Sequence, residues 1–224
     1  MRRRRLRRTR GWETVSLIDR YQELWRQGRR AVLRGDVDVQ PFGTGCWPLS
    51  VALRLDPPTR ARFADLAAEA AALVGDAYLF DHHVTVRAVD DGGLALYESA
   101  LREATAGLGP VRLRFDGVVL TRSNLMACGY PVDDTASRLR ARLAEALAAR
   151  GADGLERGRS RDIWHTTLVG FGGPVADPRG LVEWVTDRLD QPFGTARCDV
   201  ADLNRWTAAE RQQHAIPIFS APLG

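Results

Sequence analysis

The chain has 224 residues, of which 45% are hydrophobic and 27% charged. This composition is typical of a soluble globular protein and excludes a collagen-like or wholly disordered chain. Arginine and aspartate interrupt every apolar stretch before it reaches roughly 20 residues, the length that a membrane-spanning helix needs. The basic N-terminus is not followed by the apolar run of a secretory signal, so we expect a cytoplasmic protein without membrane contact.

The positive charge is concentrated at the N-terminus. All 32 basic residues are arginines, and twelve of them lie within residues 1–34 together with only three acidic residues. Such an arginine-rich segment can contact the phosphates of RNA. It can also be a solvated tail without a partner, because unpatterned charge runs are common in disordered segments. The sequence leaves both interpretations open.

Apolar residues recur at helical spacing after this arginine-rich start. They form one stripe and predict an amphipathic helix over residues 12–34 that docks onto the body of the protein. A passage rich in glycine and proline follows at residues 40–48. We therefore predict a basic tail plus amphipathic helix over 1–40, and a two-lobed domain over 41–224.

Strands and helices are predicted to alternate along the body. Strands are expected at residues 47–55, 78–89, 163–171, 197–206 and 215–220, and a strand pair at 111–131 with its turn near 122–124. Helices are expected over 94–108 and after Asp56, Asp133 and Asp177. Because the order strand, helix, strand, helix occurs twice, we predict an α+β fold of two duplicated lobes, about 46–109 and 110–224. Each lobe is expected to be an antiparallel-rich sheet with helices on its outer face, and the lobes share a central cleft.

One short pattern appears once in each predicted lobe. The sequence His-Val-Thr-Val begins at His83, and the sequence His-Thr-Thr-Leu begins at His165. Side chains alternate between the two faces of a strand, so His83 shares a face with Thr85, and His165 with Thr167. With their apolar neighbours packed under the helices, both pairs are expected to face the cleft.

Two imidazoles that face each other across a cleft suit phosphodiester chemistry, since histidine titrates near neutral pH. One imidazole can activate water as general base, while the other protonates the leaving oxygen as general acid. The two threonine hydroxyls can hydrogen-bond the phosphate oxygens as negative charge builds on them.

On these paired motifs, the chain resembles the 2H phosphoesterase superfamily, which includes the bacterial RNA 2′,3′-cyclic phosphodiesterases, also called the 2′-5′ RNA ligase family. The resemblance covers about residues 46–224. It implies metal-independent hydrolysis of a 2′,3′-cyclic phosphate, on a nucleotide or an RNA end, or of a related cyclic phosphate, to a monoester and without a cofactor. It also implies that His83, Thr85, His165 and Thr167 form the catalytic set. The alternative is a catalytically inactive member of the same fold that binds nucleotide or RNA.

Further residues are candidates for substrate binding. Arg112 and Arg114 alternate with apolar residues, so they either face the cleft and hold a phosphate or lie on an exposed edge strand. Tyr130 can stack on a nucleobase or pack in the core, and the same holds for Trp206. Arg87 shares the strand parity of the first motif.

The same alternation argues against a metal site. A zinc site built from the four histidines would need His82 and His83 on one face, but neighbouring strand residues point to opposite faces. His82 and Trp164, which precede the two motifs, are therefore expected to point away from the cleft. The three cysteines lie far apart without a C-x-x-C pair, and we expect buried free thiols.

Overall fold

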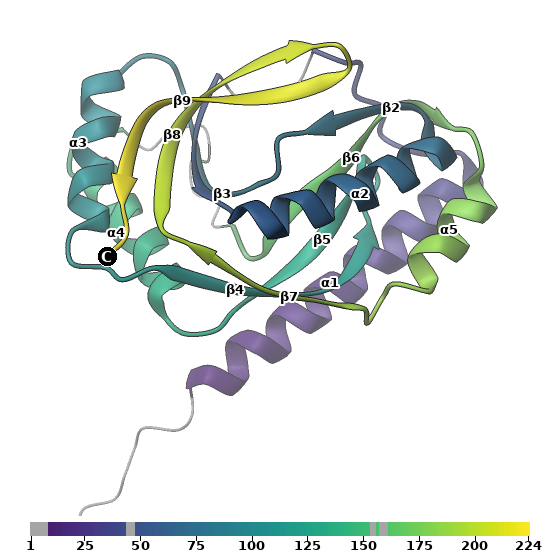
Figure 1. Ribbon diagram of the computed structural model, residues 1–224, viewed down its shortest axis with the longest axis horizontal. Coiled ribbons are helices and arrows are strands. Elements are labelled where there is room, and N and C mark those ends of the chain that lie inside the picture. Colours follow the sequence, from purple (N-terminus) through teal and green to yellow (C-terminus); the bar gives the residue numbers. More distant parts are fainter. Residues whose placement is uncertain (1–8, 44–47, 153–155, 157–160) are drawn as a thin grey trace, which may run out of the picture.

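The computed structural model describes residues 9–43, 48–152, 156 and 161–224, with side chains from residue 17 onward. Within these residues the chain forms five helices and nine strands (Figure 1). The helices are α1 (Thr9–Arg34), α2 (Pro57–Val74), α3 (Leu94–Thr105), α4 (Thr135–Ala148) and α5 (Pro178–Thr186). The strands are β1 (Leu49–Arg54), β2 (Gly75–Phe80), β3 (His83–Val89), β4 (Val111–Leu120), β5 (Asn124–Pro131), β6 (Trp164–Val175), β7 (Pro192–Cys198), β8 (Val200–Ala209) and β9 (Gln212–Pro222).

The starts of α2 and α5 follow from their Asp-Pro sequences. The Asp56 carboxylate accepts a hydrogen bond from the Thr59 amide at 2.9 Å, and the Asp177 carboxylate accepts one from the Gly180 amide at 2.9 Å. Proline fits the first turn of a helix because it has no amide hydrogen to satisfy. Both predicted helix starts are confirmed.

All nine strands form one sheet with the order β3-β1-β8-β9-β2-β6-β5-β4-β7. Every strand pair is antiparallel except β2 with β9, which is parallel. We call β3, β1, β8 and β9 the first half of the sheet, and β2, β6, β5, β4 and β7 the second half. The predicted α+β class with an antiparallel-rich sheet is confirmed.

The path of the chain differs from the prediction at two places. The expected single strand at 197–206 belongs to two strands, β7 and β8, which are separated at Asp199, and β7 begins earlier, at Pro192. The expected single strand at 78–89 is two strands, because the chain turns at Asp81 and His82 and crosses from the second half of the sheet to the first. The Asp81 carboxylate fixes this turn by accepting hydrogen bonds from β9, from the Gln212 side chain at 2.7 Å and the Ala215 amide at 3.0 Å.

Each half of the sheet contains strands from both predicted lobes. β2 lies in the second half of the sheet, whereas the C-terminal strands β8 and β9 lie in the first half. The predicted lobe ranges 46–109 and 110–224 therefore do not correspond to the two halves.

Helices cover both halves of the sheet. α2 packs on the second half, where the Phe63 ring lies 5.0 Å from the Phe115 ring and 6.0 Å from the Phe193 ring. α3 packs against α4 and contacts β8 and β9 of the first half. No helix among the described residues is long and apolar enough to cross a membrane.

α1 covers the face of the second half that is opposite α2 (Figure 1). Phe115 points toward α2, so by strand alternation Arg114 and its cross-strand partner Tyr130 point to the other face. There the Tyr21 ring of α1 meets the Tyr130 ring edge-on at 5.4 Å. The predicted docking of this helix onto the body is confirmed.

α1 approaches the sheet backbone closely at Gly28. A Cβ atom at this position would lie 2.3 Å from the Leu120 carbonyl oxygen. We expect Gly28→Val to lower the free energy of unfolding by about 2 kcal/mol, because the added side chain must push the helix off the strand backbone. The matched change Arg29→Val, on the exposed face of the same helix, should cost less than about 0.7 kcal/mol. Equal urea denaturation midpoints for the two variants would contradict this packing.

Candidate active site

The two His-x-Thr motifs lie on β3 and β6, which contact each other without being hydrogen-bonded neighbours in the sheet. One side chain joins them directly. The Thr167 carbonyl oxygen can only accept, so the Nδ1–H group of His82 donates to it at 3.2 Å. The residue before the first motif thus ties that motif to the backbone of the second.

Burial alternates along both motifs as expected for strands with one face under helices. His83, Thr85, His165 and Thr167 are half-buried, and the residues between them are buried. His82 and Trp164 point to the other face: the His82 ring lies 6.1 Å from Phe63 of α2, and Trp164 is buried. The predicted orientation of these two residues is confirmed.

The hydrogen bonds of His83 fix its tautomer. Its Nδ1 lies 2.6 Å from the carbonyl oxygen of Asp81, which can only accept, so Nδ1 carries the proton. The Nε2 atom is then the unprotonated nitrogen, and its lone pair accepts a hydrogen bond from the Thr85 hydroxyl at 3.1 Å. A neutral imidazole in this state can take a proton from water.

Both motif histidines are in an environment that disfavours positive charge. Burial lowers the pKa of His83 to about 4 and the pKa of His165 to about 3, and the positive charge of Arg161 adds to both shifts. At neutral pH both imidazoles are therefore unprotonated. A phosphate anion placed between them would raise these pKa values again, because a nearby negative charge favours the protonated form.

Arginines line this region in excess of acidic groups. The buried Glu156 carboxylate accepts a hydrogen bond from the Arg161 guanidinium, lies 3.8 Å from Arg87 and accepts the Ala88 amide at 3.3 Å. Arg140 donates to the Arg161 carbonyl at 2.7 Å, and its charge also lowers the pKa of His165. Three arginines around one carboxylate leave a net positive charge, which favours an anionic ligand.

Only part of this cluster is predictable from the sequence. Arg87 shares its strand face with His83 and Thr85, so alternation was enough to find it. Glu156 and Arg161 lie between α4 and β6, where no periodicity relates them to the motifs.

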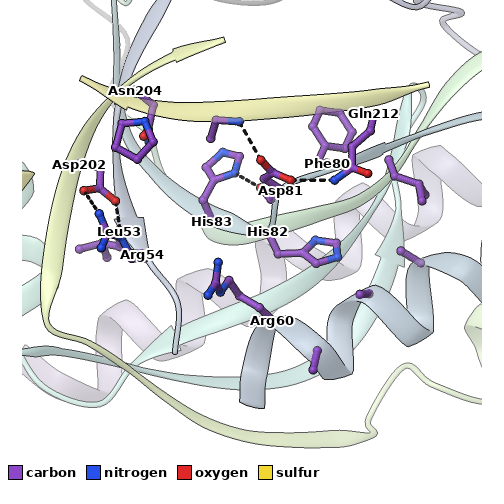
Figure 2. Close-up of a pocket in the computed structure, with 16 residues that line it drawn as sticks. Leu53, Arg54, Arg60, Phe80, Asp81, His82, His83, Asp202, Asn204 and Gln212 are labelled. Carbon is purple, nitrogen blue, oxygen red and sulfur yellow. Dashed lines mark hydrogen bonds and ion pairs between the residues drawn. The ribbon is translucent and has the colours of Figure 1, made fainter. Parts of the chain in front are cut away.

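A groove of about 450 Å³ opens beside His83 (Figure 2). Arg54 and Asp202 form an ion pair of 2.6 Å on one side of it, and Arg60 extends from α2 toward it. Asn204 also lines the groove, and its buried side-chain oxygen accepts no hydrogen bond from the described residues. The groove thus offers both cationic and hydrogen-bonding groups to a polar ligand.

Trp206 joins the histidine site rather than the core. Its ring lies 4.7 Å from the His83 ring, and its indole N–H donates to the Ser50 hydroxyl at 2.9 Å. It therefore restricts the position of the His83 imidazole from the first half of the sheet.

Tyr130 lies on β5, one strand away from the second motif, and Arg112 and Arg114 lie on β4, two strands away. The guanidinium of Arg112 is ion-paired with Asp133 at 2.8 Å, and that of Arg114 is ion-paired with Asp116. Arg114 also lies over the Tyr130 ring, 5.5 Å from its centre, in a separate cavity beneath α1. Their substrate-binding role stays a prediction.

Cys128 and Cys198 are buried free thiols as expected, and Cys46 lies outside the described residues.

The low histidine pKa values predict how stability depends on pH. An unfolded histidine titrates near pH 6.5, so between about pH 6.5 and pH 4 the unfolded chain binds protons that the native site does not. The free energy of unfolding should fall as pH is lowered through this window, by up to about 1.4 kcal/mol per pH unit for each histidine. Denaturant unfolding of His165→Gln should show a shallower pH slope than the wild type. Parallel slopes would contradict a desolvated, neutral His165 imidazole.

Three solved structures with a similar fold cover most of this chain. TT0787 of Thermus thermophilus has a TM-score of 0.59 and 16% identity, over 78% of this chain and 97% of that one. E. coli LigT complexed with 3′-AMP has a TM-score of 0.58 and 16% identity, over 82% and 99% of the two chains. A protein described as a phosphoesterase has a TM-score of 0.55 and 15% identity, over 82% and 99%. No family model matches the sequence, and no curated protein matches it. This chain thus shares the fold of LigT and TT0787 over most of its length.

Proposed function

We propose that this protein is a metal-independent phosphodiesterase that opens a 2′,3′-cyclic phosphate, on a nucleotide or an RNA end, or a related cyclic phosphate, to a monoester. The observation that carries the proposal is the meeting of two His-x-Thr pairs, from strands far apart in the sequence, in one desolvated site flanked by arginines. The LigT structure with 3′-AMP supports it, because 3′-AMP is a nucleotide monoester of the kind that this reaction releases.

In this proposal His83 is the general base. Its Nε2 lone pair takes a proton from water, and the water oxygen forms a bond to phosphorus. The bond between phosphorus and the 2′ or 3′ oxygen breaks on the opposite side. His165, protonated in the substrate complex, gives its proton to that leaving oxygen. In the net reaction, the hydroxyl group of water is added to phosphorus and a hydrogen is added to the released oxygen.

The charges around the site serve the same reaction. The negative phosphate offsets the effect of Arg161 on His165 and so favours the protonated acid. In the substrate complex the Thr85 hydroxyl turns from His83 Nε2 to a non-bridging oxygen, which leaves Nε2 open to water. The hydroxyls of Thr85 and Thr167 then stabilise the non-bridging oxygens as charge builds on them.

Two binding roles belong to the proposal as well. Arg112 and Arg114 are candidates for the phosphates of a longer substrate, and the arginine-rich segment at the N-terminus is a candidate for RNA contact. Residues 1–8 of that segment lie outside the described residues.

Substitution of the motif residues tests the catalytic roles. His83→Ala and His165→Ala should each reduce kcat for a cyclic nucleotide by about 10²–10⁴-fold, the usual effect of losing a positioned proton-transfer group. Thr85→Val and Thr167→Val keep the shape but remove the hydroxyl, and each should cost about 10²–10³-fold. Thr207→Val, at an exposed position of β8, is the matched control and should retain wild-type turnover.

The outcome also decides between catalysis and binding alone. The double histidine variant should be little worse than the poorer single variant, because the two groups act as one unit. A folded single histidine variant with near-normal turnover would refute two-histidine catalysis. A wild-type protein that binds cyclic nucleotides without hydrolysing them would favour the inactive binding alternative.

Metal independence is tested separately. Hydrolysis followed by phosphorus NMR should proceed at an unchanged rate after prolonged treatment with EDTA. Loss of activity that zinc or manganese restores would show that the reaction is metal-assisted.

A further inference from the structure

A second cavity, which we call the α1 pocket, lies between α1 and the second half of the sheet. Its volume is about 670 Å³, within the range of cavities that hold small organic ligands. Its walls include Tyr21, Trp25, Arg114, Cys128, Tyr130 and Asp190. Two of these residues come from α1, so the pocket depends on the docked helix.

The floor of the α1 pocket continues the strand face that carries the second motif. Cys128 of β5 is the direct cross-strand partner of His165, and Tyr130 lies two residues further on the same face. Arg114 of β4 is in turn the partner of Tyr130. Since neighbouring strands are about 4.8 Å apart, Cys128 lies one strand away from His165 and Arg114 two strands away, and the pocket continues to Pro192 at the start of β7. A ribose and base attached to a phosphate at His165 can span that separation.

Aromatic rings in the α1 pocket are held in place before any ligand binds. The Tyr21 hydroxyl donates to the Gly129 carbonyl oxygen at 3.0 Å, contacts the Trp164 carbonyl oxygen and accepts the Trp164 amide at 3.2 Å. Its ring meets Tyr130 edge-on, and Trp25 is half-buried one helical turn further along α1. Flat aromatic rings in fixed positions can stack on a nucleobase.

Polar groups of both kinds border these rings. The carboxylates of Asp116 and Asp190 line the pocket and can accept hydrogen bonds from amino groups of a ligand. Burial raises the pKa of Tyr130, and the negative charge of Asp116 and Asp190 adds to the shift, so its hydroxyl keeps its proton and can donate. Stacking surfaces combined with donors and acceptors at their edges match a heteroaromatic ring that bears amino and carbonyl groups.

We propose that the α1 pocket binds the nucleobase of a nucleotide whose cyclic phosphate lies between His83 and His165. This inference rests on the proposed function and adds that the substrate is a nucleoside cyclic phosphate rather than a cyclic phosphate of any alcohol. It also assigns the N-terminal helix to substrate recognition.

The test compares substrates that carry the same five-membered cyclic phosphate with and without a base. Cytidine and adenosine 2′,3′-cyclic phosphate carry a base, and glycerol 1,2-cyclic phosphate does not. The wild type should have a higher kcat/KM for the nucleotides. Trp25→Leu keeps apolar volume but removes the stacking ring. It should reduce the ratio of nucleotide to glycerol kcat/KM by roughly 5- to 150-fold, the effect of losing one base stack, mainly through KM.

Trp184→Leu is the matched control. Trp184 is also half-buried on a helix, but it lies on α5, where its indole N–H donates to Glu69 at 3.2 Å. This variant should keep the wild-type ratio. If Trp25→Leu fails to fold, two other variants replace it. Trp25→Phe keeps an aromatic ring, whereas Tyr130→Leu removes one. The ratio of nucleotide to glycerol kcat/KM should therefore fall less in Trp25→Phe than in Tyr130→Leu.

The possible failures are distinguishable. Equal hydrolysis of nucleotides and glycerol cyclic phosphate by the wild type, or an unchanged ratio in Trp25→Leu, would overturn the nucleobase pocket and leave the proposed function intact. If neither substrate is hydrolysed, the proposed function fails, and calorimetry with cytidine and adenosine 3′-monophosphates decides the pocket. Binding that Trp25→Leu weakens supports it, and absent or equal binding overturns it.

Discussion

The turn at Asp81 and His82 holds the candidate active site together. It is the point where the chain passes from β2 in one half of the sheet to β3 in the other. Its polar groups all face different elements: the Asp81 carboxylate binds β9, the Asp81 carbonyl binds the His83 ring, and the His82 ring binds the β6 backbone at Thr167. One turn therefore sets the tautomer of the first motif histidine and the approach of the second motif. Any change that loosens it would disturb both motifs at once.

Burial and positive charge act together on the two imidazoles. Neutral histidine is inexpensive to bury, whereas a charged imidazole beside Arg161 is not, so the protein stabilises the unprotonated pair. Glu156 compensates only part of the arginine charge. The protonated acid that the proposed reaction needs is consequently favoured only when an anion is present. Ligand binding and proton uptake are coupled in such a site, so the general acid is protonated when the anionic substrate is bound.

The sequence was sufficient wherever local periodicity or capping decides the structure. It predicted the Asp-Pro starts of α2 and α5, the docked helix α1, and the outward orientation of His82 and Trp164. It was insufficient for the exchange of strands between halves, because the pairing of β2 with β9 joins residues far apart in the chain and has no local signature. Glu156 and Arg161 could not be predicted for the same reason, since only tertiary packing brings them to the histidines.

α1 shows why the N-terminal segment cannot be treated as an appendage. The solved structures are covered almost completely, whereas about a fifth of this chain lies outside the match, a share comparable to the predicted segment 1–40. The helix in that segment contacts the beginning of β6 through Tyr21 and, by an ion pair of 2.9 Å between Arg20 and Asp162, reaches the residue after Arg161. An exposed pair of this kind contributes at most about 1 kcal/mol, but together with the buried tyrosine it fixes the backbone on both sides of Ile163. Arg161 and His165, which lie on either side of this stretch, are therefore positioned in part by the N-terminal helix.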